Sequence, residues 1–466
     1  MRILLLNPPS PAGTQYVRVE RCMQKKSAWA GSLWQPMPLL YVQSYLKSKG
    51  YSQTKLVDAV AEEMDTHKTI DLIKSFDPDI LVLNTAVPTV KNDIQFAEFA
   101  KTYGIKVIAI GVPVTTIPEA FNKKIDFGIR NDPEYATYDI VRNIETKKPI
   151  PKKFISATKP FTMIYHPVEN LNDLPMPDVS DLKLDAYTLP FTRKRLMLVE
   201  PGRGCPYGCI YCLVPHLSGR KLRLRDPVKF VDEIERDYNE YGIRNFLFWV
   251  ESATFDQKNM IAICDEIIKR NLRINWMTPT RVDIVNPELL KKMHQAGCWM
   301  LSYGIESIEP EVLKIIQKGI NVEQMENAIK WTRDVEIKVM AHIIFGLPGQ
   351  TKETLNKTLD WLFKNKVDYA QFYCSVPYWG TQLRVIAEKN GWIESNDYSL
   401  YEIDKSVMHT DTLTSKEIEY MREIAFKKFY LRPSKIMSEI WENKTNPKYI
   451  LNLAKDGLNF LFDWVR

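Results

Sequence analysis

The first third of the chain alternates short apolar runs with amphipathic stretches. Runs such as residues 80–83 and 107–110 are almost continuously apolar, which indicates strands buried on both faces. Helical spacing of the apolar residues between such runs predicts helices that cover a parallel sheet. We therefore expect an α/β fold that begins with a doubly wound sheet over residues 1–146. The predicted strands are 2–6, 55–57, 79–84, 106–111 and 125–129, and the predicted helices are 38–49, 66–74, 90–103 and 133–144.

Open sheets of this kind bind their ligands beyond the carboxyl ends of the strands. The residues that directly follow the predicted strands are therefore the candidate binding residues of the first domain. They are Asn7, Pro8, Pro9, Ser10, Asp58, Ala59, Asn84, Thr85, Gly111, Val112, Pro113, Arg130, Asn131 and Asp132.

A second β/α series begins after residues 147–190, a stretch that holds seven prolines and little periodicity. Its aromatic side chains, such as Phe154 and Phe161, favour an ordered linker over a disordered tether. Residues 191–400 then predict a partial (β/α)6 barrel, with its chemistry on the loops after the strands. Residues 401–466 predict a helical C-terminal region. The predicted barrel strands are 196–200, 245–250, 274–278, 299–304, 339–345 and 369–375.

Composition excludes several classes of protein. The 466 residues are 45% apolar and 26% charged, the mix of a packed soluble protein. The net charge of +6 is too weak to indicate nucleic acid binding by itself. No run of 18 apolar residues predicts a membrane-spanning helix, and the opening apolar run is too short for a signal peptide. We therefore expect a cytoplasmic protein.

Three of the seven cysteines fall within eight residues, at Cys205, Cys209 and Cys212. They follow the first predicted barrel strand, so they lie on a loop at the barrel mouth. Three thiolates at this spacing can ligate three irons of a cubane cluster and leave the fourth iron open. The alternative is a structural zinc site with His216 as the fourth ligand. A zinc site of that kind is expected in a small domain with little core, which this chain is not.

The spacing of these cysteines, with the aromatic Tyr211 before the last one, resembles the radical S-adenosylmethionine (SAM) enzymes. The resemblance implies a [4Fe-4S] cluster whose open iron chelates the amino and carboxylate groups of SAM. It also implies that reductive cleavage of SAM yields a 5′-deoxyadenosyl radical.

Later segments match the same family in order, each at the end of a predicted strand. The resemblance implies SAM contacts at Glu251 or Ser252, at Arg281, at Gly304 with Glu306, and at the loop that begins with Gly346. The family's usual glycine pair is missing after the second strand. Taken singly, the glycines could be strand-exit turns and Glu306 could cap a helix.

The first domain contains Asn7-Pro8-Pro9 after the opening strand, Pro36-x-Pro38-Leu39 at a helix start, Val57-Asp58-Ala59 and Gly111-Val112-Pro113. With these segments it resembles the cobalamin-binding subgroup of that family, which has a Rossmann-like sheet ahead of the barrel. The resemblance implies that the strand-end residues of this domain hold cobalamin. A departure is the absence of the Asp-x-His-x-x-Gly motif that supplies a histidine to cobalt in other B12 proteins. The alternative is a sheet domain that only shapes the substrate pocket.

The resulting hypothesis is a radical SAM enzyme that uses cobalamin for C-methylation of an unactivated carbon. Cyclisation or carbon–carbon coupling within the same subgroup stays open, and so do the substrate and the catalytic side chains. A tRNA methylthiotransferase is disfavoured because Cys22 is the only cysteine ahead of the barrel. The expected partners are a small-molecule or lipid substrate and an electron donor such as ferredoxin or flavodoxin, without nucleic acid.

Residues 449–466 combine aromatic and apolar residues on one side of a predicted helix, with lysines upstream. Such a helix can lie in a membrane interface. The alternative is a helix that packs on the barrel. A peripheral membrane contact would favour a lipid substrate.

Overall fold

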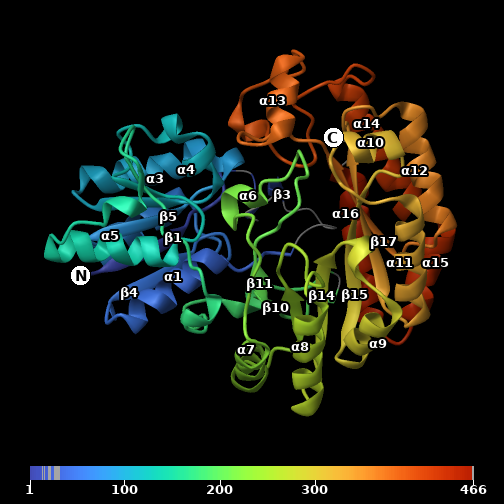
Figure 1. Ribbon diagram of the computed structural model, residues 1–466, viewed down its shortest axis with the longest axis horizontal. Coiled ribbons are helices and arrows are strands. Elements are labelled where there is room, and N and C mark those ends of the chain that lie inside the picture. Colours follow the sequence, from blue (N-terminus) through green and yellow to red (C-terminus); the bar gives the residue numbers. More distant parts are fainter. Residues whose placement is uncertain (13, 15, 19–22, 26–31, 191, 464–466) are drawn as a thin grey trace.

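The computed structural model describes residues 1–12, 14, 16–18, 23–25, 32–190 and 192–463, and only the backbone of 23–25 and 456–463. Cys22 lies outside this part of the chain. The fold expected from the sequence is confirmed: an α/β domain, a partial barrel and a helical C-terminus follow one another. Figure 1 shows the first domain and the barrel side by side, with α6 (Val214–Leu217) between them.

The first domain is a seven-stranded sheet in the order β4-β1-β5-β6-β7-β9-β8. All neighbouring strands are parallel except β8 and β9, which pair antiparallel. Alternate side chains of β1 enter two different cores, because Leu5 packs with α1 and α5 while Leu4 packs with α2 and α3. The strands are β1 (Ile3–Asn7), β4 (Thr54–Asp58), β5 (Ile80–Asn84), β6 (Lys106–Ile110), β7 (Phe127–Ile129), β8 (Ile155–Ala157) and β9 (Thr162–Ile164). The helices are α1 (Met37–Ser48), α2 (Thr66–Phe76), α3 (Val90–Thr102), α4 (Val112–Thr116) and α5 (Glu134–Thr146).

Part of the proline-rich stretch belongs to this sheet. Its two short strands, β8 and β9, extend the edge next to β7, which the sequence did not predict. A small hairpin of β2 (Tyr16–Arg18) and β3 (Met23–Lys25) precedes α1.

The second sheet has six parallel strands in chain order, as predicted for a partial barrel. Its first and last strands do not pair with each other, so the barrel is open. The strands are β10 (Leu196–Val199), β13 (Asn245–Phe248), β14 (Asn275–Thr280), β15 (Cys298–Glu306), β16 (Lys338–Phe345) and β17 (Tyr369–Cys374). A two-stranded ribbon, β11 (Gly202–Arg203) and β12 (Arg223–Leu224), stands beside this sheet.

Helices cover the outside of the barrel sheet (Figure 1). Most of them begin at a residue whose side chain accepts a backbone N–H of the first turn, the preferred N-cap arrangement. These caps are Asp226, Asp256, Asn286, Asn321, Thr351 and Thr381. The helices are α7 (Pro227–Glu240), α8 (Gln257–Lys269), α9 (Pro287–Gln295), α10 (Pro310–Ile315), α11 (Val322–Asp334), α12 (Lys352–Lys364) and α13 (Gln382–Lys389).

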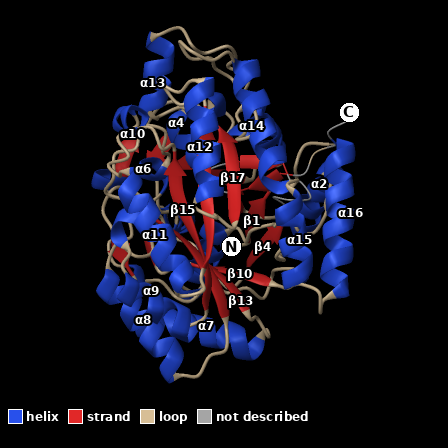
Figure 2. Ribbon diagram, turned by 90° about the vertical axis from the view of Figure 1, so that its right-hand side faces the viewer, coloured by secondary structure: helices blue, strands red, loops and turns tan. Residues whose placement is uncertain are grey.

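Three helices form the C-terminal region: α14 (Ser415–Tyr430), α15 (Pro433–Glu442) and α16 (Pro447–Asp463). The first packs on the last barrel strand, where the Tyr430 hydroxyl donates to Ala370 O and accepts from Ala370 N. Figure 2 shows α15 and α16 side by side at the edge of the molecule. Among the described residues, no helix is long and apolar enough to cross a membrane.

Candidate functional site

The three clustered cysteines lie on the loop between β11 and α6. Gly204, which starts this loop, has φ +96°, and a Cβ there would lie 2.1 Å from Lys221 O. Only glycine fits this close approach. The Gly204 N–H donates to the Glu251 Oε2 atom at 3.0 Å, and Cys205 N donates to Gly219 O at 3.2 Å. These contacts fix the entry of the chain into the cysteine loop.

The middle of the loop is held by two other elements of the barrel. Ile210 N donates to Ile316 O, which follows α10, at 3.2 Å. Ile210 O accepts from Leu383 N of α13 at 2.9 Å. The loop that carries the cysteines is therefore anchored on both sides.

None of the three thiols takes part in a disulfide, and all three are half-buried. Burial raises the pKa of the Cys205 thiol. No three His, Cys, Asp or Glu side chains in the described part of the chain stand close enough to hold one metal ion. His216, the fourth ligand of the zinc alternative, instead pairs through Nε2 with Gly380 O at 2.9 Å.

A buried polar network lies directly behind the cysteine loop. Glu306 Oε1 accepts from the Lys318 ammonium at 2.8 Å and from the Tyr211 hydroxyl at 3.0 Å. Glu306 ends β15 with φ +64°, a conformation that non-glycine residues adopt only under strong constraint. Although burial lowers the pKa of Lys318, the charges of Glu306 and Cys209 raise it overall. Lys318 is thus an ammonium held beside the cysteine loop.

A second cation, Arg281, connects this network to the cysteine loop. The Arg281 guanidinium stacks on the Tyr207 ring at 3.6 Å from its centroid and forms an ion pair with Asp283 at 2.8 Å. Its Nη2 also donates to Lys318 O at 2.8 Å. Arg281 and Lys318 together place two positive charges close enough to Cys209 to interact with its thiol.

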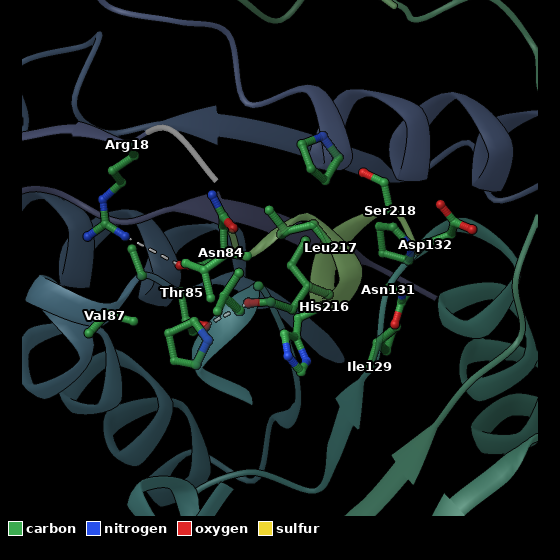
Figure 3. A pocket seen from close by; sticks show the side chains of 18 of the residues that line it. Arg18, Asn84, Thr85, Val87, Ile129, Asn131, Asp132, His216, Leu217 and Ser218 are labelled. Carbon is green, nitrogen blue, oxygen red and sulfur yellow. Dashed lines mark hydrogen bonds between the residues drawn. The ribbon is translucent and has the colours of Figure 1, made fainter. Parts of the chain in front are cut away.

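A pocket separates the strand ends of the first domain from the segment that follows the cysteines (Figure 3). On the sheet side it is lined by residues that follow β5, β6 and β7; on the barrel side it is lined by Glu200, Arg203, α6 and Tyr378. Of the predicted strand-end residues, Asn84, Thr85, Gly111, Val112, Pro113, Asn131 and Asp132 line it.

Three lining residues carry a buried polar atom for which the described residues supply no partner. These atoms are Arg18 Nε, Asn131 Oδ1 and His216 Nδ1. Two segments that line the pocket are packed closely together, since a Cβ on Gly111 would lie 2.3 Å from Thr85 O. Unused polar atoms around a strand-end pocket fit a ligand rich in amide groups, as cobalamin is.

Residues 199–362 match the family described as the Radical SAM superfamily. This part of the chain is a radical SAM domain. The match contains all three cysteines and the strands from β13 to β16. A radical SAM domain implies a [4Fe-4S] cluster and SAM, and three cysteines outside any disulfide on one anchored loop fit that cluster.

Relatives extend the similarity beyond this domain. An uncharacterized methyltransferase of Pyrococcus horikoshii is 27% identical over 471 residues, which cover 98% of both chains. An anaerobic magnesium-protoporphyrin IX monomethyl ester cyclase of Rubrivivax gelatinosus is 25% identical and covers 99% of this chain and 83% of its own.

Two solved structures have the same architecture. The cobalamin-dependent radical enzyme OxsB, with aqua-cobalamin bound, has a TM-score of 0.71 and 15% identity, over 98% of this chain and 71% of its own. The methyltransferase TsrM of Kitasatospora setae, with cobalamin and a [4Fe-4S] cluster bound, has a TM-score of 0.65 and 17% identity, over 84% and 75%. At this identity the likeness establishes the fold of the radical SAM domain and its partner sheet.

The predicted SAM contacts cluster around the radical SAM cysteine loop. Tyr211, Glu251, Arg281 and Glu306 are tied to that loop or to the network behind it. Ser252 is buried, and its hydroxyl has no partner among the described residues. Their contact with SAM stays a prediction.

The two glycines predicted at strand exits have packing reasons of their own. A Cβ on Gly304 would lie 2.6 Å from the Lys318 Nζ and Glu306 Oε1 atoms. Gly346, at φ +84°, faces Ile418 of α14 at a similar distance. Gly304 therefore borders the network, whereas Gly346 allows α14 to approach the end of β16.

The predicted cobalamin contacts at the end of β1 stay a prediction. Asn7, Pro8 and Pro9 are absent from the described pocket lining. The Asn7 amide donates to Asp58 Oδ1 at 2.8 Å, and Asp58 Oδ2 accepts from the Tyr187 hydroxyl at 2.7 Å. This buried network joins β1 and β4 to the segment before the barrel.

Sequence reasoning missed the ionic contact between the two domains, which we call the clasp. It consists of Asp132 and Glu134 of the first domain with Glu200, Arg203 and Arg223 of the barrel. Arg203 lies 3.2 Å from Asp132, 2.8 Å from Glu134 and 2.9 Å from Glu200. Arg223 pairs with the other oxygen of Asp132. All five side chains are nearly inaccessible to solvent. Because Arg203 stands two positions before Cys205, the clasp connects the wall of the pocket to the start of the cysteine loop.

A polar pair inside the barrel was also missed. His342 of β16 pairs through Nδ1 with the Tyr373 hydroxyl of β17 at 2.9 Å, and their rings stack. Burial lowers the pKa of His342 to about 4, and Glu306 and Lys318 are the charges that act on it. A lone histidine in an apolar run gave no signal for this pairing.

Proposed function

We propose that this protein is a cobalamin-dependent radical SAM enzyme that transfers a methyl group to an unactivated carbon of a small-molecule or lipid substrate. The observation that supports it most is the position of the pocket. One wall is made of the carboxyl ends of β5, β6 and β7, and the other is α6, which begins two residues after Cys212. A cofactor in this pocket would therefore contact α6, the helix that directly follows the loop with the cluster cysteines.

When bound, the cluster supplies the electron that cleaves SAM, and cobalamin supplies methyl-transfer chemistry. The chain's own residues hold and orient these groups. Cys205, Cys209 and Cys212 would ligate the cluster, with the positive charges of Arg281 and Lys318 beside Cys209. The strand-end residues and Arg18, Asn131 and His216 offer polar contacts to the corrin side chains. A small electron-transfer protein such as ferredoxin or flavodoxin delivers the electron.

Cyclisation is the second candidate, favoured by the similarity to the magnesium-protoporphyrin ester cyclase over almost the whole chain. The two reactions differ in what becomes of SAM. A methyl transfer leaves S-adenosylhomocysteine from the donor molecule and 5′-deoxyadenosine from the cleaved one. Cyclisation by a radical alone leaves 5′-deoxyadenosine without S-adenosylhomocysteine.

The test is anaerobic reconstitution of the full chain with iron and sulfide, addition of hydroxocobalamin, desalting and reaction of SAM with dithionite. We expect about four irons per chain, one retained cobalamin, and both products from SAM. About eight irons would indicate a methylthiotransferase-like second cluster, and zinc alone would contradict radical chemistry. Retention of no cobalamin by the iron-loaded chain would make the first domain a scaffold.

A further inference from the structure

Helix α15 exposes the apolar side of an amphipathic helix. Met437 and Trp441 are 70% and 72% exposed, and Ile436 and Ile440 are 42% and 44% exposed. These residues stand at i, i+1, i+4 and i+5, so they share one face of the helix. We call them the α15 apolar face.

The orientation of α15 is fixed by polar contacts on its other side. Lys435 and Glu439 form an ion pair at 2.7 Å, and the Tyr449 hydroxyl of α16 donates to Glu439 at 2.8 Å. At the end of the helix, Glu442 pairs with Lys338 of β16 at 3.0 Å. A helix on a soluble protein usually turns its apolar face inward. Here the polar face is turned inward and the apolar face is held toward the solvent.

The surroundings of this face are positively charged. Residues 428–455 contain six basic and two acidic residues. Both acidic residues, Glu439 and Glu442, are already neutralised by ion pairs. The exposed lysines form no ion pair with the described residues, and one of them, Lys444, lies 4.1 Å from the centroid of the Trp441 ring. They are Lys428, Lys444, Lys448 and Lys455.

We propose that α15, with the first turn of α16, binds the surface of a bilayer that contains anionic lipids. The α15 apolar face enters the boundary between headgroups and acyl chains, where Trp side chains are favoured, and the lysines meet the anionic headgroups. A second copy of the chain fits this surface less well, because a symmetric contact would bring the same positive charges together.

The proposed membrane contact lies on α15, whereas the sequence suggested residues 449–466. Tyr449, the first residue of that segment, is buried against α15. Deleting residues 448–466 would therefore leave the α15 apolar face in place, and it would also remove the tyrosine that orients Glu439. Substitutions on α15 are the sharper test.

The experiment is flotation of the full, iron-loaded chain with vesicles of phosphatidylcholine, alone or mixed with phosphatidylglycerol, at low and high salt. We compare wild type with Met437→Ser/Trp441→Ser and with Lys444→Glu/Lys448→Glu. The matched control is Tyr420→Ser, because Tyr420 of α14 is 60% exposed and lies outside the α15 apolar face. Equal iron content and equal SAM cleavage in solution show that each variant is folded.

Wild type and Tyr420→Ser should float only with the mixed vesicles, more strongly at low salt. Loss of two large apolar side chains should lower the partition coefficient at least about tenfold. The charge-reversal variant should lose its salt dependence. Absence of wild-type flotation, or equal flotation of wild type and Met437→Ser/Trp441→Ser, would overturn the proposal. So would a dimer in sedimentation that dissociates in that variant without any flotation. None of these outcomes bears on SAM cleavage, so the proposal is tested apart from the proposed function.

Discussion

Arg203 offers the strongest test of how the two domains are joined. Its side chain is 9% exposed and contacts the carboxylates of three side chains that are 1%, 0% and 11% exposed. In Arg203→Met these carboxylates keep their burial and lose their shared cation. Removing one partner of a buried ion pair destabilises a protein by about 3–5 kcal/mol. This is a large share of the roughly 5–15 kcal/mol that stabilises a folded domain.

A matched control is available on the surface. Arg195 pairs with Asp185 at 2.6 Å, but the two side chains are 44% and 74% exposed. Because an exposed pair contributes about 0–1 kcal/mol, Arg195→Met should change stability little. The two substitutions remove the same chemical group, so their difference isolates the effect of burial.

The loss of unfolding free energy in Arg203→Met can come from the lost charge or from lost packing, and its pH dependence distinguishes the two. Burial raises the pKa values of Glu134 and Glu200, and the Arg203 charge partly opposes that rise. A carboxyl whose folded pKa is raised destabilises the fold increasingly as the pH climbs through that pKa. Without Arg203 the rise is larger, so the penalty should be larger at about pH 8 than at about pH 5.

The assay is urea unfolding of the iron-loaded chain, followed by tryptophan fluorescence at both pH values, for wild type and both variants. A penalty for Arg203→Met no larger than that for Arg195→Met would refute the clasp as a stabilising contact. A large penalty that does not change with pH would place the loss in packing around Tyr41, over whose ring Arg203 lies, instead of in electrostatics.

Three further predictions concern the cofactors and the barrel interior. Cys209→Ala should abolish dithionite-driven formation of 5′-deoxyadenosine, whereas Cys264→Ala, buried in α8, should retain it; equal rates would contradict the cluster assignment. Gly111→Ala should retain less cobalamin after desalting at unchanged iron content, because its Cβ would lie 2.3 Å from Thr85 O; unchanged retention would move the site elsewhere. Burial lowers the pKa of His342 from 6.5 to about 4, so stability present above pH 6.5 is lost as the pH falls toward 4. On acidification from about pH 7 to pH 5, His342→Gln should lose about 2 kcal/mol less than wild type in urea unfolding.

Periodicity was enough to predict the regular part of the fold. Buried strands such as β5 and β6 are nearly continuous apolar runs. Because the helices between the strands have apolar residues at helical spacing, the order of these elements implied both sheets. The short strands β8 and β9 were missed because three residues in a proline-rich stretch carry no periodic signal. The strand β15 runs on to Glu306, beyond the expected end at residue 304, because the network with Lys318 holds its last residues.

In the site, likewise, the features formed by neighbouring residues could be predicted, and the contacts between residues far apart in the chain could not. The cysteine spacing is local, so the loop could be recognised in the sequence. The clasp joins Arg203 to a carboxylate 71 residues earlier in the chain, and Arg18 reaches Asp93 from a hairpin 75 residues away. No pattern in the sequence pairs such charges, because the fold alone brings them together.

The clasp also couples the first domain mechanically to the cysteine loop of the barrel. Arg203 is at once a member of the clasp, a residue of the pocket wall and the residue two positions before Cys205. Any movement of the first domain against the barrel would therefore strain a buried ion network and, through Gly204, the entry of the cysteine loop. A chain built in this way ties the shape of the strand-end pocket to the geometry of the loop that holds the cluster. If the first domain binds cobalamin as proposed, Arg203→Met should retain less cobalamin after desalting and also cleave SAM more slowly, whereas Arg195→Met should change neither.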